Sequence, residues 1–179
     1  MNRKLKNEEL NRISKDEFRE SEKAPVIVVL DNIRSINNVG SVFRTSDAFR
    51  VEAIYLCGIT ATPEHREIQK TALGAQESVK WKYFEKTTDA IDELSSKGYS
   101  SWAIEQTENS SMLNNWKNVR ENPVALVFGN EVFGVEQEVI DKCEGVIEIP
   151  QLGTKHSLNI SVSAGIVIWE AVKNCDLFD

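Results

Sequence analysis

Two short runs of uninterrupted apolar residues constrain the fold of this chain more than any other feature. They are Val26–Leu30, with the sequence VIVVL, and Val124–Phe128, with the sequence VALVF. Because neither run alternates with polar residues, each is expected to be buried on both faces, as strands of parallel sheets are. Parallel strands need helical crossovers, which cover both faces of the sheet. The two runs therefore indicate an α/β fold.

The rest of the chain alternates between strand and helix patterns, as βαβ units do. Asn37 or Asn38 is expected to cap the helix after the first run, and Thr87 or Thr88 a later one. We predict one α/β domain over residues 25–179, with a mostly parallel sheet and helices on both faces. Further strands are expected at Ala53–Cys57, Val79–Phe84, Tyr99–Ile104 and Val146–Ile149, and helices at Glu64–Leu73, around Ala90–Leu94, at Val135–Cys143 and after Ser157 and Asn159.

The N-terminal segment differs from the rest because it is charged throughout. We predict a helical extension over residues 1–24, in which residues 1–22 form a polar helix with a thin apolar stripe. Such a helix buries little by itself, so it either docks on the domain or meets a partner. The stripe is Leu10, Ile13 and Phe18, and the basic residues Arg3, Lys4 and Lys6 precede it.

Composition places the chain among ordinary globular proteins, with 41% hydrophobic and 27% charged residues in 179. Since no apolar run approaches the roughly 20 residues that span a bilayer, we expect no membrane segment. The three cysteines are far apart and the two histidines are isolated, which favours a reducing cytoplasm and no metal site. A net charge of −7 argues against broad nucleic-acid binding, including DNA, but allows a local basic surface.

The usual nucleotide and hydrolase motifs are missing: GxGxxG, GxxxxGK[ST], GxSxG and HExxH do not occur. Residues Ile147–Glu170 instead join a short strand, a loop with Pro150 and Gly153, and an apolar helix. That arrangement brings backbone groups to a ligand, although it also suits one more scaffolding unit of an α/β domain.

Three segments, each following an expected strand, resemble motifs 1, 2 and 3 of the SpoU/TrmH family of RNA methyltransferases, which belongs to the SPOUT class. They are NNVGSVFRTSDAF at Asn37–Phe49, LVFGNEVFGV at Leu126–Val135, and IEIPQLGTKHSLNISVSAG at Ile147–Gly165. The resemblance covers about Val26 to Ala171. It implies a SPOUT fold with a C-terminal trefoil knot, S-adenosylmethionine as cofactor, a homodimer, and transfer of a methyl group to a ribose 2′-hydroxyl.

The resemblance also assigns roles to individual residues. Read without it, Asn38 and Ser157 are helix caps and Arg44 is a solvated helix residue. A guanidinium is a poor general base, so positioning the phosphate and the 2′-hydroxyl is the safer role for Arg44. The implied catalytic residues are Asn38, Arg44, Glu131, Ser157 and Asn159, and the implied cofactor-binding residues are Glu105, Gly129, Ile149, Ser157 and Leu158.

Basic residues in or near the expected loops could form the local surface that holds RNA phosphates. We expect tRNA as the substrate, with guanosine 18 as one candidate, and ribosomal RNA as the alternative. A non-catalytic RNA-binding member of the same fold and an unrelated α/β nucleotide-binding protein are the rivals. The expected RNA-binding residues are Arg34, Arg44, Arg50, Arg66 and Lys155, with Lys70 nearby.

Overall fold

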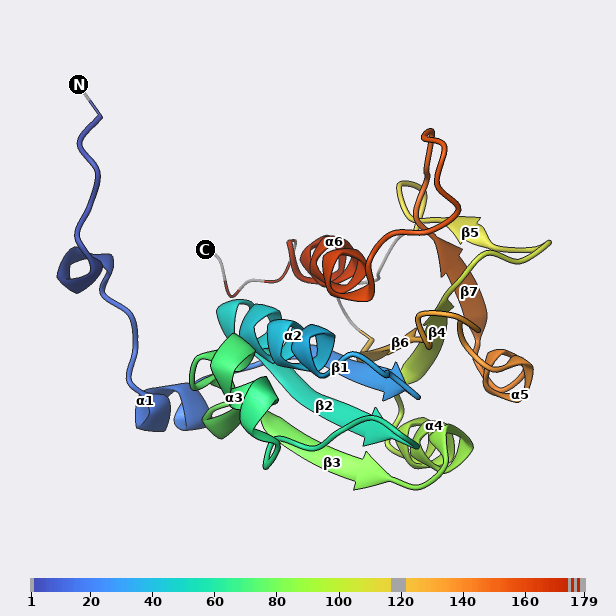
Figure 1. Ribbon diagram of the computed structural model, residues 1–179, viewed down its shortest axis with the longest axis horizontal. Helices are drawn as coiled ribbons and strands as arrows, with labels where there is room; N and C mark the ends of the chain where they lie inside the picture. Colours follow the sequence, from blue (N-terminus) through green and yellow to red (C-terminus); the bar gives the residue numbers. More distant parts are fainter. Residues whose placement is uncertain (1, 117–121, 174, 176, 178–179) are drawn as a thin grey trace.

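The computed structural model describes residues 2–116, 122–173, 175 and 177. These residues form a sheet of seven parallel strands in the order β3-β2-β1-β6-β4-β7-β5 (Figure 1). The two apolar runs become the neighbouring central strands β1 and β6, which confirms the expected α/β fold. The strands are β1 (Ala24–Asp31), β2 (Val51–Cys57), β3 (Lys80–Phe84), β4 (Ser100–Ile104), β5 (Ser111–Met112), β6 (Val124–Phe128) and β7 (Gly145–Glu148).

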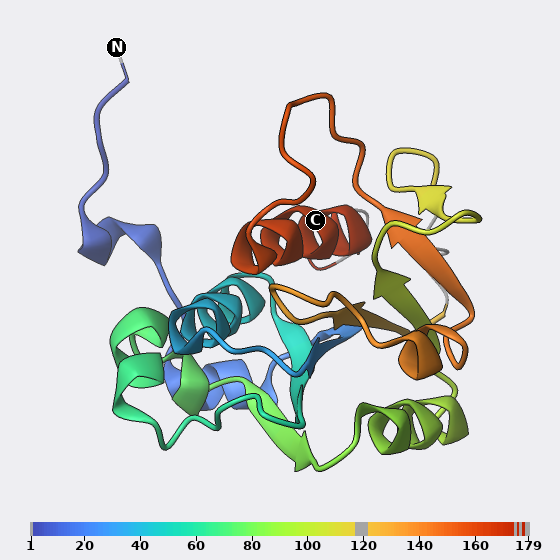
Figure 2. The same cartoon turned by 45° about the vertical axis from the view of Figure 1, so that its right-hand side comes forward.

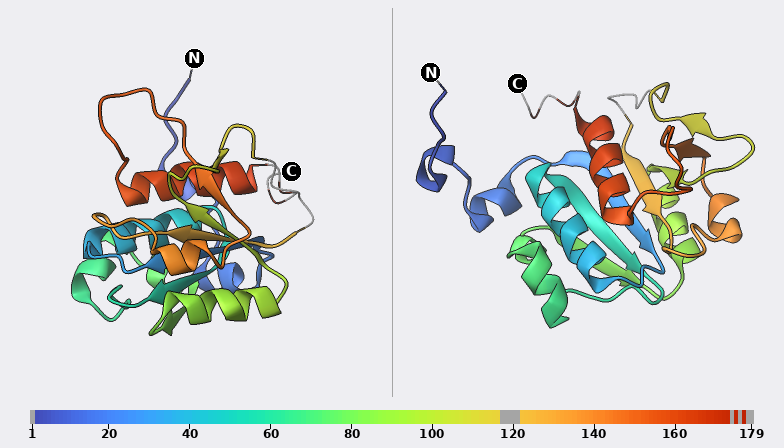
Figure 3. Two further views of the ribbon diagram at one scale, coloured as in Figure 1. Left: turned by 90° about the vertical axis from the view of Figure 1, so that its right-hand side faces the viewer. Right: turned by 45° about the horizontal axis from the view of Figure 1, so that its top comes forward.

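Helices cover both faces of the sheet, as Figure 3 shows. Alternate residues of β1 enter two separate cores: Val28 packs in the core that contains α2 and α6, and Val29 in the core that contains α4 and α5. None of the described helices is long and apolar enough to cross a membrane. The helices are α1 (Lys15–Glu20), α2 (Ile36–Ala48), α3 (Arg66–Ala72), α4 (Thr87–Ser96), α5 (Gln137–Ile140) and α6 (Ile160–Val172), with 3₁₀ turns at Asn7–Leu10 and Ala75–Glu77.

The predicted caps of α2 and α4 are wrong because the side chains concerned have other partners. Ser35 caps α2, accepting a hydrogen bond from the Asn38 backbone N–H at 3.3 Å. Helix α4 begins after Lys86, which provides no side-chain cap. Thr87 lies in the first turn of α4, and its buried hydroxyl donates to the Asp31 carboxylate at 2.5 Å.

Of the two C-terminal helices, α5 differs from its expected limits, whereas α6 begins after Asn159 as expected. Helix α5 is only Gln137–Ile140. Glu136 before it has an extended backbone, held by its N–H bond to Asp31, and turns follow Ile140. Asn159 caps α6, accepting from the Ser161 N–H at 2.9 Å. Ser157 lies in the preceding loop, so its expected role as a cap is wrong. Figure 2 shows this loop between β7 and α6 projecting from the body.

The single polar helix expected over residues 1–22 is wrong as well. A left-handed Asn11 ends the 3₁₀ turn, and Ser14 starts α1 anew with a capping box to Glu17. Of the expected apolar stripe only Phe18 is buried, where it joins the main core, whereas Leu10 and Ile13 are exposed. Helix α1 therefore docks on the domain while the segment before it projects outwards (Figure 1).

The strand order places a crevice at the carboxyl ends of β1 and β6. After β1 the chain moves to the β2 side of the sheet, and after β6 it moves to the β4 side. The loops that follow β1 and β6 therefore diverge from each other. In open α/β sheets ligands bind at such a switch point, and the loops found there contain motifs 1 and 2.

Candidate active site

A tight turn after β6, residues 130–134, is the rigid centre of the site. Asn130 is buried, and its side-chain amide donates to the backbone oxygen of Asn32 at 2.7 Å. Its side-chain oxygen accepts from the N–H groups of Val132 at 2.9 Å and Phe133 at 3.2 Å. Two backbone bonds of 2.9 Å between Asn130 and Gly134 close the turn. The turn is thus fixed to the β1 side of the crevice.

Two glycines allow this turn to pack against its surroundings. A Cβ atom on Gly129 would lie 2.1 Å from the carbonyl carbon of Gly134 and from the nitrogen of Val135. Gly134 has a φ of +71°, and a Cβ there would lie 2.1 Å from Oε2 of Glu105. Gly129 also lines the cavity described below, so its predicted cofactor contact and this close approach are compatible.

Glu131 holds motif 1 in place. Its carboxylate accepts hydrogen bonds from the backbone N–H groups of Arg34 and Ser35, both at 2.9 Å, and from the Asn38 amide at 3.1 Å. The Asn159 amide in turn donates to Oδ1 of Asn38 at 3.2 Å. Motifs 1, 2 and 3, which are distant in the sequence, therefore meet in one hydrogen-bonded chain of three side chains.

The environment of Glu131 favours its ionised form. Burial acts to raise the pKa of this carboxyl, but the N–H groups of Arg34, Ser35 and Glu131 itself, with the Asn38 amide, lower it below its usual value. A group whose pKa is lowered in the folded state adds stability above its unfolded pKa of about 4.3. That stability is lost as the pH falls through the folded pKa.

We therefore expect Glu131→Gln to lower the melting temperature at pH 7. The difference from wild type should become smaller below about pH 4. The reason is that wild-type Glu131 becomes protonated there and loses the same charge-assisted bonds. Thermal melts of both proteins between pH 7 and pH 3 measure this difference. A difference in melting temperature that stays constant down to pH 3 would contradict the proposed role of the Glu131 charge.

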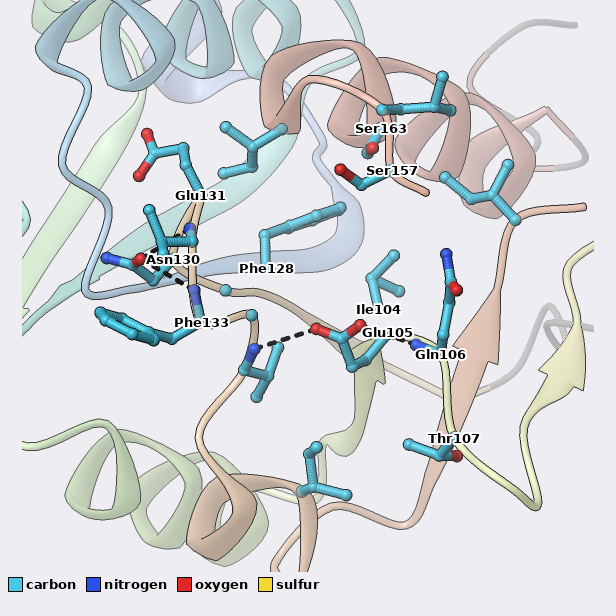
Figure 4. A pocket seen from close by; sticks show the side chains of 18 of the residues that line it. Ile104, Glu105, Gln106, Thr107, Phe128, Asn130, Glu131, Phe133, Ser157 and Ser163 are labelled. Atoms are coloured by element: carbon cyan, nitrogen blue, oxygen red, sulfur yellow. Dashed lines mark hydrogen bonds between the residues drawn. The ribbon is translucent and has the colours of Figure 1, made fainter. Parts of the chain in front are cut away.

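Beside this hydrogen-bonded chain lies a cavity of about 690 Å³ at the carboxyl ends of β4, β6 and β7 (Figure 4). Its walls combine apolar side chains with amides, hydroxyls and two carboxylates, those of Glu105 and Glu131. Among the described lining residues there is no lysine or arginine. The expected site residues that line it are Glu105, Gly129, Glu131, Ile149, Ser157, Leu158 and Asn159.

Glu105 has a structural role that its place in the sequence does not predict. Its carboxylate accepts from the N–H of Gln106 at 2.8 Å and from that of Val135 at 3.2 Å, which ties the loop after β4 to the turn after β6. Gln106 also lines the cavity, and its amide donates to the backbone oxygen of His156 at 2.7 Å. The position of Gln106 just after an expected strand end was the available signal.

Arg44 lies outside this cavity, in a second one of about 660 Å³ between α2, α3 and the start of α6. The two cations there, Arg44 and Lys70, are accompanied by hydroxyl side chains, a combination suited to phosphate groups. Gly40 lets α2 and α3 approach, since a Cβ there would lie 1.8 Å from Oγ1 of Thr71. The hydroxyl residues of the second cavity are Ser41, Thr45, Thr71 and Ser161.

The structure separates the other basic residues. Arg34 is exposed beside the Glu131 carboxylate, Arg66 begins α3, and Lys155 lies in the projecting loop. Arg50 directly precedes β2 and therefore lies at the amino end of the sheet, opposite Arg34. The expected basic residues therefore do not share one surface.

The fold and the site define a parallel α/β protein with a ligand cavity at the carboxyl ends of its strands. Residues 25–169 match the model of the SpoU rRNA Methylase family, so the chain belongs to that family, and the resemblance of its three motifs is confirmed. A Staphylococcus haemolyticus protein assigned to the TrmH family of tRNA/rRNA methyltransferases is 30% identical over 163 residues. Those residues are 88% of this chain but 64% of that relative, so the chain spans less than two thirds of its length.

Solved structures of the family have the same fold. The AdoMet-bound rRNA methyltransferase from Sinorhizobium meliloti gives a TM-score of 0.78 at 27% identity, covering 87% of this chain and 59% of that one. The A. aeolicus TrmH/SpoU tRNA modifying enzyme gives 0.78 at 25% identity, covering 89% and 81%.

Proposed function

We propose that the chain transfers a methyl group from S-adenosylmethionine to a ribose 2′-oxygen in RNA. The observation that carries this proposal is the chain of hydrogen bonds from Glu131 through Asn38 to Asn159 at the mouth of a cavity. Family membership adds weight to it, since a relative was solved with this cofactor bound. The intact set of expected catalytic residues argues against a non-catalytic RNA-binding member.

The main cavity suits S-adenosylmethionine. Its volume lies within the usual range for small-molecule sites. Apolar walls such as Ile149 and Leu158 fit an uncharged adenine, and two carboxylates without a described lysine or arginine suit a cationic sulfonium better than a phosphate. When bound there, the cofactor would supply an electrophilic methyl group. The 2′-oxygen would accept it as the carbon–sulfur bond breaks, and the hydroxyl proton would pass to solvent.

The second cavity gives the RNA backbone a place beside the first. Asn159 lines the main cavity and Ser161 the second, and the Ser161 hydroxyl donates to Oδ1 of Asn159 at 2.7 Å. A phosphate held by Arg44 would therefore place its ribose near Asn38 and Asn159. Since a guanidinium holds its proton too firmly to act as a base at neutral pH, Arg44 fixes the phosphate and the 2′-hydroxyl.

For the substrate we favour tRNA, with guanosine 18 as the first position to examine, in a cytoplasmic setting. In support, the A. aeolicus relative, which has a TM-score of 0.78 to this chain, is a tRNA modifying enzyme. Transfer of tritium from labelled S-adenosylmethionine to bulk tRNA and to ribosomal RNA, measured separately, tests this preference. Labelling of ribosomal RNA alone would overturn it, and labelling of neither would count against the activity.

We also propose that two copies of the chain pair through α6, close to the site. The inner face of α6 is buried, whereas Val162 and Ile166, one helical turn apart, are 51% and 39% exposed. Large apolar residues at this spacing form a stripe suited to a second copy of the same helix. Figures 1 and 3 show α6 on the outside of the molecule.

Ile166→Glu is expected to convert a dimer into a monomer, because it places a charge in the apolar contact without touching the inner face of α6. Light scattering after size-exclusion chromatography measures the mass. Leu152→Glu, which makes the same kind of change on the projecting loop, is the control and should stay dimeric. A dimeric Ile166→Glu protein would contradict pairing through this face.

The C-terminal trefoil knot belongs to the same proposal. It is supported by the SPOUT-like neighbours and by the place of β6 between β1 and β4. A pair of cysteines introduced at the two ends of the chain would test it. Once crosslinked, a knotted chain keeps a compact, fast-migrating form in denaturant, and an unknotted one migrates as a plain circle.

A further inference from the structure

Phe133 is far more exposed than large aromatic residues usually are, with 83% of its surface accessible. It is not on a loose loop. Its N–H donates to the Asn130 side chain, and the turn is closed by the backbone bonds between Asn130 and Gly134. The ring is therefore held in water by a fixed backbone, next to Val132, which is 63% exposed. Nothing in the described fold depends on burying this ring.

The position of Phe133 is suited to contact with the RNA. The same turn directs Glu131 to the backbone of Arg34 and to Asn38, where the proposed ribose lies. Phe133 lines the rim of the main cavity two residues further on (Figure 4). We propose that Phe133 is a stacking platform for a nucleobase at or next to the methylated ribose. This inference rests on the proposed function.

The chemistry of the surroundings favours a base over other occupants. The inside of the cavity is already walled by Ile104, Phe128 and Ile149, so the exposed ring of Phe133 adds an apolar surface at its rim. Single-stranded RNA sites usually offer exposed aromatic rings on which bases stack. The turn also holds the backbone of the exposed Arg34, through the Glu131 carboxylate. Because every base has a π-face, Phe133 would add affinity without choosing the base.

Phe133→Ala should raise the KM for RNA about tenfold, within the range expected for losing one stacked base. Its affinity for S-adenosylmethionine, measured by calorimetry, and its melting temperature should match those of wild type. Phe133→Leu keeps apolar volume but not the ring, so it should be as impaired as the alanine variant. Phe133→Tyr should restore wild-type KM. Ile59→Ala, which removes a similarly exposed apolar side chain that lines neither cavity, is the matched control.

The results for these variants either support or overturn the stacking role of Phe133. If Phe133→Leu behaves like wild type, or if Phe133→Ala weakens cofactor binding or dimerisation to the same extent as it raises KM, the stacking role is overturned. Should wild type methylate no RNA, the proposed function fails, and filter binding of the same RNA to wild type and Phe133→Ala then decides the inference separately. Equal binding by both proteins would overturn it, and about tenfold weaker binding by the variant would support it.

Discussion

Arg44→Ala is expected to lower kcat for RNA methylation by about 10²–10³-fold, the usual loss when one charged donor at a reacting centre is removed. The affinity for S-adenosylmethionine should not change, because Arg44 lies in the second cavity and does not line the first. Since the side chain is exposed, the melting temperature should not change either. Steady-state kinetics with saturating cofactor, together with calorimetry, separate these quantities.

Two further variants sharpen this prediction. Arg66→Ala removes an exposed cation near the start of α3 and should change kcat little, because Arg66 lines neither cavity. Arg44→Lys keeps the charge but not the forked geometry, and should recover only part of the activity. Wild-type kcat in Arg44→Ala would show that this arginine does not act at the reacting centre.

Gly129→Ala is expected to damage both the fold and cofactor binding. A Cβ atom there would overlap the backbone of Gly134 and Val135, so the whole turn must shift. Overpacking of this kind costs about 1–3 kcal/mol, which lowers the melting temperature by about 2–12 °C in a chain of this length. Because the turn lines the main cavity, the affinity for S-adenosylmethionine should fall as well.

Gly153→Ala is the matched control for this change. Gly153 lies in the loop between β7 and α6, where a Cβ would meet no atom within 4 Å, so the substitution should alter neither quantity. Differential scanning calorimetry and cofactor titration of the two variants give the comparison. Wild-type cofactor affinity in Gly129→Ala would mean that the turn does not shape the cofactor site.

The central sheet could be predicted because its signal is local. Five consecutive apolar residues in β1 and in β6 predict burial on both faces, and both strands have it. The caps of α2 and α4 could not be predicted, because the side chains concerned have partners far along the chain. Asn38 is drawn to Glu131, 93 residues away, and Thr87 to Asp31, 56 residues away, and neither distance has a signature in sequence periodicity.

The site was accessible to sequence reasoning through its three motifs, and their convergence follows from the strand order. Two features could not be predicted from the sequence: the separation of Arg44 from the main cavity and the structural role of Glu105. Both depend on where α2 and the loop after β4 lie relative to the turn at residues 130–134. The high exposure of Phe133 was equally hidden, because an apolar residue in a motif gives no indication that it faces solvent.

Identifying the methylated nucleoside tests the proposed ribose methylation most directly. Bulk tRNA and ribosomal RNA incubated with the protein and S-adenosylmethionine would be digested to nucleosides and analysed by mass spectrometry. We expect the added mass of one methyl group on the ribose, as a 2′-O-methylnucleoside, and a sharp fall in its amount with Arg44→Ala. A methyl group found on a base, or on no RNA while the cofactor binds, would contradict it.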